Sequence, residues 1–144
     1  MVPTDEEIKL AKAFADVMHV KLNSYDGTYR GELSELCLAR MMGETHNVEH
    51  NDEKKTKVYD WDLKIDGHLV DVKTATSGYF TISSYILNNA RKEILYPCYK
   101  ALVKKFTLVG VLDGKQIHKL AKNSKFYSGY YVSSEDVRKF SKIK

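Results

Sequence analysis

The chain has few of the features that mark secreted or membrane proteins. It has two cysteines among 144 residues, Cys37 and Cys98, and they lie too far apart for a metal-binding motif. We therefore expect reduced thiols in a cytoplasmic protein. The apolar runs are only a few residues long, which excludes a membrane-spanning helix. Residues 1–9 also lack the pattern of a signal peptide.

Internal repeats and low-complexity linkers are also missing, so we expect a single domain over residues 1–144. Apolar residues make up 43% of the chain and charged residues 29%, both ordinary values for a globular protein. A chain of this size can bury a core without disulfides or a structural metal.

The net charge of +4 conceals an uneven distribution. Residues 1–66 contain 14 acids and 9 bases, a net charge of −5, whereas residues 67–144 contain 5 acids and 14 bases, a net charge of +9. A basic half suits a polyanionic partner, and an acidic half with a few inward carboxylates suits a metal ion.

The expected secondary structure is α/β, with a central mixed sheet flanked by helices. A capping box between Thr4 and Glu7 opens a helix over residues 5–20. Residues 84–105 are mostly helical in pattern, with an interruption at Pro97. The other expected elements are a turn at 23–31, a helix at 32–42, strands at 78–83 and 130–133, a hairpin of 106–112 with 115–121 through Asp113-Gly114, and a last helix from Ser134, capped by Ser133 or Ser134.

Residues 58–75 are the most informative part of the chain. Two alternating stretches flank Asp66-Gly67, and this dipeptide between two such stretches is a strong hairpin signal. The two-residue turn makes Ile65 the partner of His68. Counting back places Asp62 opposite Asp71.

The same register places Asp60 opposite Lys73, so four charged side chains project from one face of the hairpin. Opposed Cβ atoms lie roughly 4.5–5.5 Å apart, and two aspartates at that distance repel unless a cation lies between them. Mg²⁺ takes such oxygen ligands, and Lys73 could hold a water or neutralise charge on a phosphate. The alternative is a solvent-exposed face with a plain ion pair between Asp60 and Lys73. The opposite face is apolar in either case and consists of Leu63, Ile65, Val70 and Val72.

In this order of motifs, the sequence resembles the PD-(D/E)XK nuclease superfamily. The matching stretch reads Asp62-Leu-Lys-Ile-Asp-Gly-His-Leu-Val-Asp71-Val-Lys73. Gly31-Glu-Leu-Ser-Glu35 is similar to the family's preceding helix motif, and residues 105–113 look like the strand after its crossover helix. The resemblance implies a restriction-endonuclease-like core over about residues 31–121. Residues 1–30 would add a helix and turn, and residues 122–144 a strand and helix.

The resemblance also implies roles for individual residues. Asp62, Asp71 and the carbonyl of Val72 would bind Mg²⁺ or Mn²⁺, and Lys73 would position or activate the water. Glu35 would complete the site through the metal or the water. Glu32 is an alternative to Glu35, and Asp60 is an alternative to Asp62, because no proline precedes the first acid. Cleavage would leave a 5′-phosphate.

Lysines of the basic half are candidates for contact with the phosphates of DNA, with RNA left open. They are Lys100, Lys104, Lys105, Lys115 and Lys119. A second pattern, His46-Asn-Val-Glu49-His50, matches an inverted zinc-protease motif. Its polar surroundings, without an apolar helix to bury it, argue against that use.

Three hypotheses follow. The first is a metal-dependent DNA endonuclease, and the second is a nucleic-acid-binding module that kept the fold without turnover. The third is a zinc hydrolase using His46, Glu49 and His50. Cleavage of both strands by so small a chain would suggest a homodimer. The compact size suits a phage or mobile-element protein in the cytoplasm of a prokaryotic cell.

Overall fold

The computed structural model of the chain describes residues 1–22, 25–43, 63–82, 87, 94–124 and 129–143. Its helices are α1 (Asp5–Leu22), α2 (Tyr25–Met41), α5 (Gly114–Leu120) and α6 (Ser134–Phe140). Its strands are β1 (Leu63–Ile65), β2 (His68–Val70), β3 (Lys73–Ala75), β4 (Tyr79–Ile82), β5 (Ile94–Ala101), β6 (Phe106–Asp113), β7 (Lys122–Asn123) and β8 (Tyr130–Ser133). None of the helices in these ranges combines the length and apolar character needed to cross a membrane.

The main sheet is mixed, as expected. β1 and β2 form an antiparallel hairpin, and β2 and β3 both run parallel to β5. Leu69 pairs with Ile94 and Lys73 with Cys98 at the same offset, so β2 and β3 are two parts of one strand along β5. β6 pairs with β5 in the antiparallel direction, and β4, β8 and β7 form a second, antiparallel sheet.

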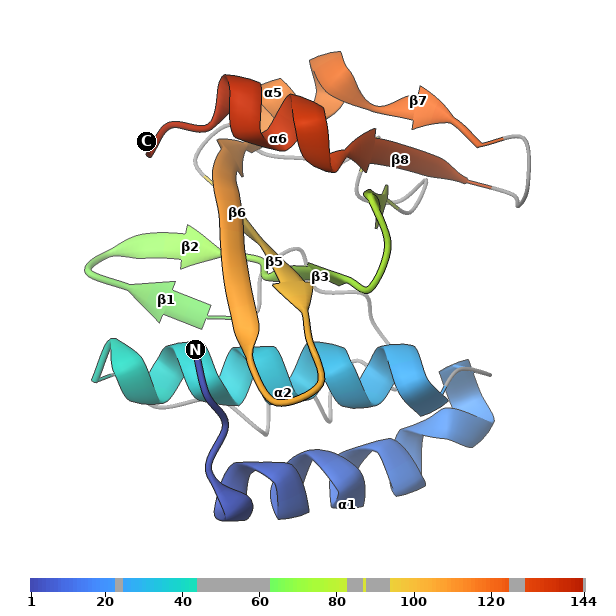
Figure 1. Ribbon diagram of the computed structural model, residues 1–144, viewed down its shortest axis with the longest axis vertical. Helices are drawn as coiled ribbons and strands as arrows, with labels where there is room; N and C mark the ends of the chain where they lie inside the picture. Colours follow the sequence, from blue (N-terminus) through green and yellow to red (C-terminus); the bar gives the residue numbers. More distant parts are fainter. Residues whose placement is uncertain (23–24, 44–62, 83–86, 88–93, 125–128, 144) are drawn as a thin grey trace.

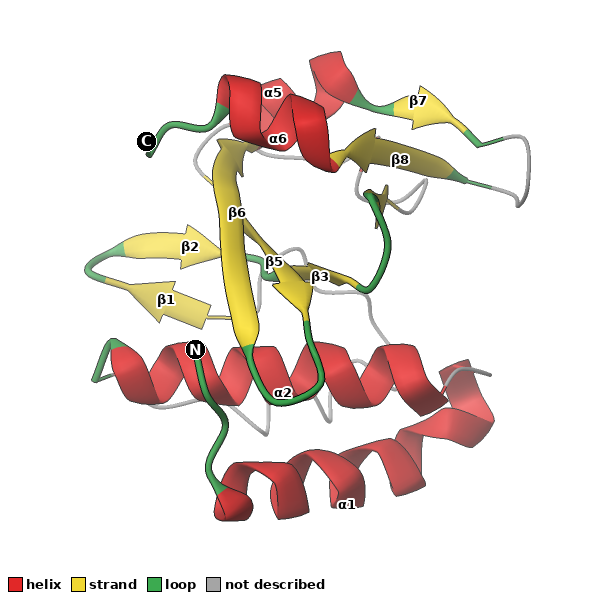
Figure 2. Cartoon of the chain, viewed as in Figure 1, coloured by secondary structure: helices red, strands yellow, loops and turns green. Residues whose placement is uncertain are grey.

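The elements stack in layers (Figures 1 and 2). α1 and α2 lie under the main sheet, and the second sheet lies on its far side together with α5 and α6. Each interface has its own core. Leu33, Cys37 and Val70 belong to the cluster next to the long helices, whereas Phe80 and Tyr96 belong to the cluster on the far side. The expected α/β class with a mixed sheet flanked by helices is confirmed.

The local signals at the two ends of the chain are also confirmed. The Glu7 side chain accepts a hydrogen bond from the Thr4 amide at 2.9 Å, and the Glu7 amide donates to the Thr4 hydroxyl at 3.2 Å. These two bonds form the predicted capping box. Ser133 caps α6 by accepting from the Asp136 amide at 3.2 Å. The amino group of Met1 donates to the Phe106 carbonyl and holds the N-terminus against β6.

The hairpin through Asp66 and Gly67 has the predicted register, with Ile65 opposite His68 and Leu63 opposite Val70. Asp66 has φ of 48° and Gly67 has φ of 81°. Positive φ at both central residues is the geometry of the tight turn whose twist matches that of the flanking strands. The dipeptide therefore fixes which side chains of β1 and β2 share a face.

The predicted turn at residues 23–31 is wrong for most of its length, because α2 begins at Tyr25 and not at Glu32. Gly27 and Gly31 are inside the helix although glycine weakens helices. Tyr29, between them, packs against the core cluster of the long helices. Tertiary packing against α1 and the sheet therefore outweighs the local preference.

The predicted helix at residues 84–105 is wrong over residues 94–101, which form β5. The apolar run is ambiguous, because a short buried strand and a buried helix share that pattern. Pro97 occurs in the middle of β5, where a proline removes a ladder hydrogen bond. The Asp71 amide donates to the Leu95 carbonyl at 2.9 Å. Backbone groups two positions apart point to the same side of a strand, so the nitrogen of Pro97 is also directed toward the strand formed by β2 and β3. The missing N–H therefore coincides with the break between β2 and β3.

The predicted second hairpin is also wrong. Asp113-Gly114 begins α5, and Asp113 is its N-cap. The Asp113 carboxylate accepts from the Gln116 amide at 2.8 Å, and the Gln116 side chain accepts from the Asp113 amide at 3.0 Å. Residues 106–113 do form a strand, but it is the antiparallel neighbour of β5. The strand that runs parallel to the motif strand is β5, so the assignment of residues 105–113 to that place is wrong.

Candidate active site

Asp71 and Lys73, two of the predicted site residues, are in contact. They are two positions apart on the strand formed by β2 and β3, so their side chains project from the same face. Lys73 Nζ lies 3.2 Å from Asp71 Oδ2. Only 9% of the Asp71 side chain and 16% of the Lys73 side chain are exposed. A charged pair with so little exposure is unusual and marks a candidate site.

The two faces of this strand have different neighbours. Val70 and Val72 belong to the core cluster next to α2, as the predicted apolar face requires. Ala75 belongs to the far cluster, and Leu69 packs against that cluster. Because side chains alternate, Asp71 and Lys73 share the face of Leu69 and Ala75. The charged pair therefore lies on the side of the sheet that faces the second sheet.

The backbone around Asp71 also follows from the register. The Asp71 amide points toward β5, since it donates to the Leu95 carbonyl. The carbonyl of the next residue, Val72, therefore points the other way along the sheet, to the side of β1. That is the direction in which the continuation of β1 would lie.

Both candidate helix glutamates are buried. Glu32 is 4% exposed and Glu35 is 7% exposed, on a helix that contacts both β1 and β3. The Oε1 atom of Glu35 is enclosed by protein. A buried carboxylate is retained only with compensating contacts. Both acids lie on α2, which covers the Val70 and Val72 side of the sheet, whereas Asp71 and Lys73 project from the other face.

Cys98 is the β5 residue directly opposite Lys73. Burial raises the pKa of its thiol to about 12, while Lys73 lowers it and Asp71 raises it. Burial likewise raises the pKa of Cys37 to about 11, with a further increase from Glu7. Both thiols are free and buried. They remain protonated at neutral pH, which makes them poor nucleophiles and metal ligands.

A groove of about 450 Å³ opens beside Lys73, between the first half of α2 and the β3–β4 segment. We call it the hydroxyl groove. Its other lining residues include Arg30 and Gly31 on α2. Its hydroxyl side chains are those of Thr28, Thr74, Thr76, Ser77, Tyr79 and Thr81. The candidate site therefore continues into an open surface lined by hydroxyl-bearing residues.

Several predicted residues lie outside the described part of the chain. These are Asp60 and Asp62, together with His46, Glu49 and His50 of the zinc motif. Among the described residues, no three His, Cys, Asp or Glu side chains form a group able to hold a metal ion. The opposition of Asp62 to Asp71 stays a prediction, now resting on the observed pairing of Leu63 with Val70.

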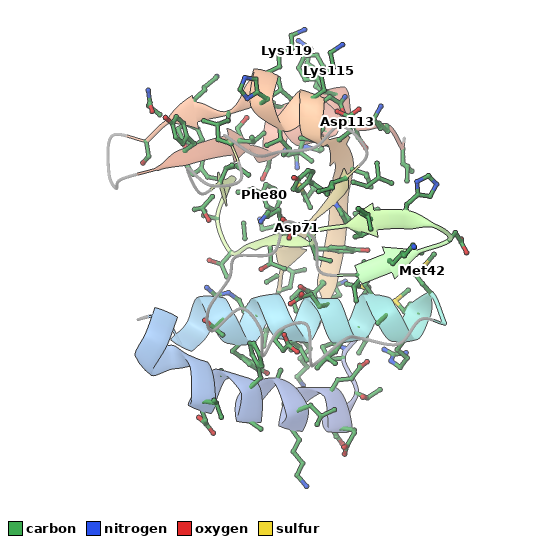
Figure 3. The ribbon with its side chains drawn as sticks, turned by 180° about the vertical axis from the view of Figure 1, so that it is seen from behind. Met42, Asp71, Phe80, Asp113, Lys115 and Lys119 are labelled. Carbon is green, nitrogen blue, oxygen red and sulfur yellow. The ribbon has the colours of Figure 1, made fainter. Side chains whose placement is uncertain are left out.

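The candidate phosphate-binding lysines do not gather on one surface. Lys104 and Lys105 are exposed in the turn between β5 and β6, which borders α2. Lys100 is exposed near the end of β5. Lys115 and Lys119 are exposed on α5, at the end of the molecule away from α1 and α2 (Figure 3). This division of the five lysines is not apparent from their order along the chain.

Arg30 and the hydroxyl side chains of the groove are not among the predicted site residues. The predicted turn at residues 23–31 includes Arg30, so its place on a helix facing β3 is unexpected. A signal is present in the run Thr74-Ala-Thr-Ser-Gly directly after the D-x-K motif. Small hydroxyl residues at that place extend the site along the strand.

The chain was also compared with known proteins. No model of a known protein family matches it, and a search of curated proteins gave no significant match. The interpretation of the site therefore depends on its residues and their geometry.

Proposed function

We propose that the protein is a metal-dependent nuclease with a restriction-endonuclease-like core of the PD-(D/E)XK type, hydrolysing DNA phosphodiester bonds. The observation that carries the proposal is the contact between Asp71 and Lys73 on the strand after the Asp66-Gly67 hairpin. The D-x-K pair of such a site needs to share one face of a strand, and these two side chains do.

The topology supports the same proposal. The motif strand continues the second strand of the hairpin, α2 contacts the sheet at β1 and β3, and the next long strand, β5, runs parallel to the motif strand. A parallel neighbour requires a crossover connection between the two strands. The resemblance implies such a connection, with β5 in the place that the sequence pattern assigns to residues 105–113.

The oxygen donors of the site fit a hard divalent cation. Asp71 supplies a carboxylate and Val72 a carbonyl directed to the β1 side, where the register would bring Asp62. Mg²⁺ and Mn²⁺ prefer such ligands, and both buried thiols are unsuited to them. When bound, the ion would polarise the phosphate and lower the pKa of a coordinated water.

Lys73 would act through its positive charge. The carboxylate of Asp71 holds the Lys73 ammonium in place at 3.2 Å. A fixed ammonium with little exposure can orient the attacking water and stabilise the negative charge that develops on the phosphate. Glu35, with Glu32 as the alternative, would be the helix acid of the site, as the resemblance implies.

The test is cleavage of plasmid, single-stranded DNA and RNA with Mg²⁺, Mn²⁺ or a chelator. Asp71→Asn and Lys73→Met should each lower the rate by about 10²–10³-fold, as expected when a charged group of the transition state is lost. Lys64→Met is the matched control, because Lys64 is an exposed lysine of the same hairpin. Thermal melting curves identify an assay temperature at which every variant is folded.

The outcomes separate the hypotheses. Metal-independent cleavage, or cleavage that survives both substitutions, would contradict the assignment. Binding without cleavage by the unmodified protein would favour the inactive binding module. Loss of a Zn²⁺-dependent activity on His46→Ala would favour the zinc hydrolase.

A further inference from the structure

The hydroxyl groove has the chemistry of a phosphate-binding surface. Its described lining contains two cations, Arg30 and Lys73, and no aspartate or glutamate. The charge of Lys73 is paired with that of Asp71 beside the groove, at 3.2 Å. Hydroxyl groups and a guanidinium donate hydrogen bonds to phosphate oxygens, and the guanidinium can do so with two bonds. The groove therefore favours an anionic ligand rich in acceptor atoms.

Arg30 connects the groove to a second hollow, which is mostly apolar and has lysines at one side. It also lines a hollow of about 510 Å³ beneath the β5–β6 turn, together with Lys104 and Lys105. Asp5 contributes an acid to the lining of that hollow. The cations therefore form a path from Lys73 through Arg30 to the turn. Lys115 and Lys119, at the opposite end of the molecule, are not on this path (Figure 3).

Tyr79 adds an aromatic surface to the groove. It lines the groove and is 56% exposed. Its ring packs edge to face with that of Tyr131, with centroids 5.1 Å apart, so it is held by the pairing of β4 with β8. An exposed, positioned ring next to phosphate-binding groups suits stacking with an unpaired base.

We propose that this groove binds a single strand of nucleic acid, with its backbone passing Lys73 and Arg30 toward Lys104 and Lys105. This inference rests on the proposed function, because the bound strand would lead to the Asp71–Lys73 pair. The substrate would therefore be an unpaired strand that follows this path.

Gly31 allows a test that leaves the fold intact. A Cβ atom at Gly31 meets no atom within 4 Å, and the residue is helical, so a side chain there would be accommodated and would favour the helix. Gly31→Glu and Gly31→Gln introduce side chains of nearly equal shape and different charge. Fluorescence anisotropy with a labelled mixed-sequence DNA oligonucleotide, in chelator, should show at least about tenfold weaker binding for Gly31→Glu. Equal affinities of the two variants would overturn the groove assignment.

A second pair of variants tests the path. Lys104→Glu with Lys105→Glu should weaken binding and reduce the slope of log affinity against log salt by about 0.7 for each phosphate that the protein no longer neutralises. Lys115→Glu with Lys119→Glu makes the same change in net charge on α5 and should leave the slope unchanged. Equal effects of the two pairs would mean that net charge, and not this path, governs binding.

The form of the substrate has its own control. Tyr79→Phe should keep the affinity and Tyr79→Ala should lower it by about tenfold. A duplex of the same sequence should bind more weakly than the single strand, and equal or tighter duplex binding would overturn the single-strand assignment. If the protein binds the strand as expected but never cleaves it, the proposed function fails and the groove stands. If it cleaves and Gly31→Glu cleaves equally well, the groove fails and the function stands.

Discussion

Two aspartate–lysine pairs in this protein have nearly the same geometry and different surroundings. Lys73 Nζ is 3.2 Å from Asp71 Oδ2, and Lys142 Nζ is 3.0 Å from Asp113 Oδ2. In the first pair both side chains are less than one fifth exposed, whereas 46% of the Lys142 side chain is exposed. The distance alone does not distinguish the pairs. Their environment decides what each can do.

Asp113 has a structural role that its contacts describe. It caps α5 by accepting from the Gln116 amide, and it contacts the lysine of the C-terminal segment. Burial raises its pKa, but the hydrogen bond from Gln116 and the charge of Lys142 outweigh burial, so the pKa is below its ordinary value. Asp71 lies instead within the main sheet, beside a buried thiol and at a break in the β-ladder.

The largest predicted difference between the pairs is in stability. Lys73→Met removes the positive charge from a carboxylate with little exposure, and we expect the free energy of unfolding to fall by about 3 kcal/mol. Urea unfolding followed by circular dichroism measures this. The double variant Asp71→Asn with Lys73→Met should recover most of the loss, because no charge is then left uncompensated.

The stability recovered in the double variant distinguishes an uncompensated buried charge from a loss of packing at Lys73. If the single and double variants lose the same stability, the loss is due to the lysine side chain as a packing element. The Asp71→Asn variant alone should be less destabilised than Lys73→Met, since it leaves a partly exposed lysine near a neutral amide.

For the Asp113 pair we expect a smaller effect that divides into two parts. Asp113→Ala removes the cap and should lower the free energy of unfolding by about 1 kcal/mol. Asp113→Asn keeps a capping oxygen and removes only the charge, so it should cost less. Cleavage should be unchanged in both variants. A cost for Asp113→Asn as large as that for Asp113→Ala would contradict the division.

The stability that the charge of Asp113 contributes should depend on pH in a defined direction. The folded pKa of Asp113 is lowered, so the stability from its ionised form is present above the unfolded pKa of about 3.9 and is lost as the pH falls through the folded pKa. The difference in melting temperature between the unmodified protein and Asp113→Asn should therefore be full at about pH 7 and shrink below about pH 4.

The two Asp-Gly dipeptides explain why part of the fold could be predicted and part could not. Asp66-Gly67 makes a turn with positive φ at both residues, whereas Asp113 has φ of −97° and caps a helix. Both follow an alternating stretch, and the deciding residue is three positions after the aspartate. Gln116 at that place completes a capping box, and Leu69 cannot. The sequence therefore contains the signal that separates the two dipeptides, although the hairpin pattern is the more obvious of the two.

Other parts depend on contacts that no local pattern contains. The hairpin register and the shared face of Asp71 and Lys73 follow from a period of two and a turn, so they were predictable. β5 could not be predicted, because a proline such as Pro97 argues against a central strand. Pro97 is tolerated in β5 because the neighbouring strand is interrupted opposite it, between β2 and β3. The groove beside Arg30 requires knowing that α2 begins at Tyr25. That start depends on packing against the core.

The smallest predicted effect belongs to Lys142, and it tests whether the environment is the correct basis for the comparison. Lys142→Met makes the same substitution as Lys73→Met in a pair of nearly the same length. Because nearly half of the Lys142 side chain is exposed, solvent screens the pair and the loss should be at most about 0.5 kcal/mol. Moderate salt should remove even this difference, whereas it should leave most of the effect at Lys73. Equal losses for the two lysines, measured by urea unfolding, would mean that the two pairs are energetically alike and that burial does not set Asp71 and Lys73 apart.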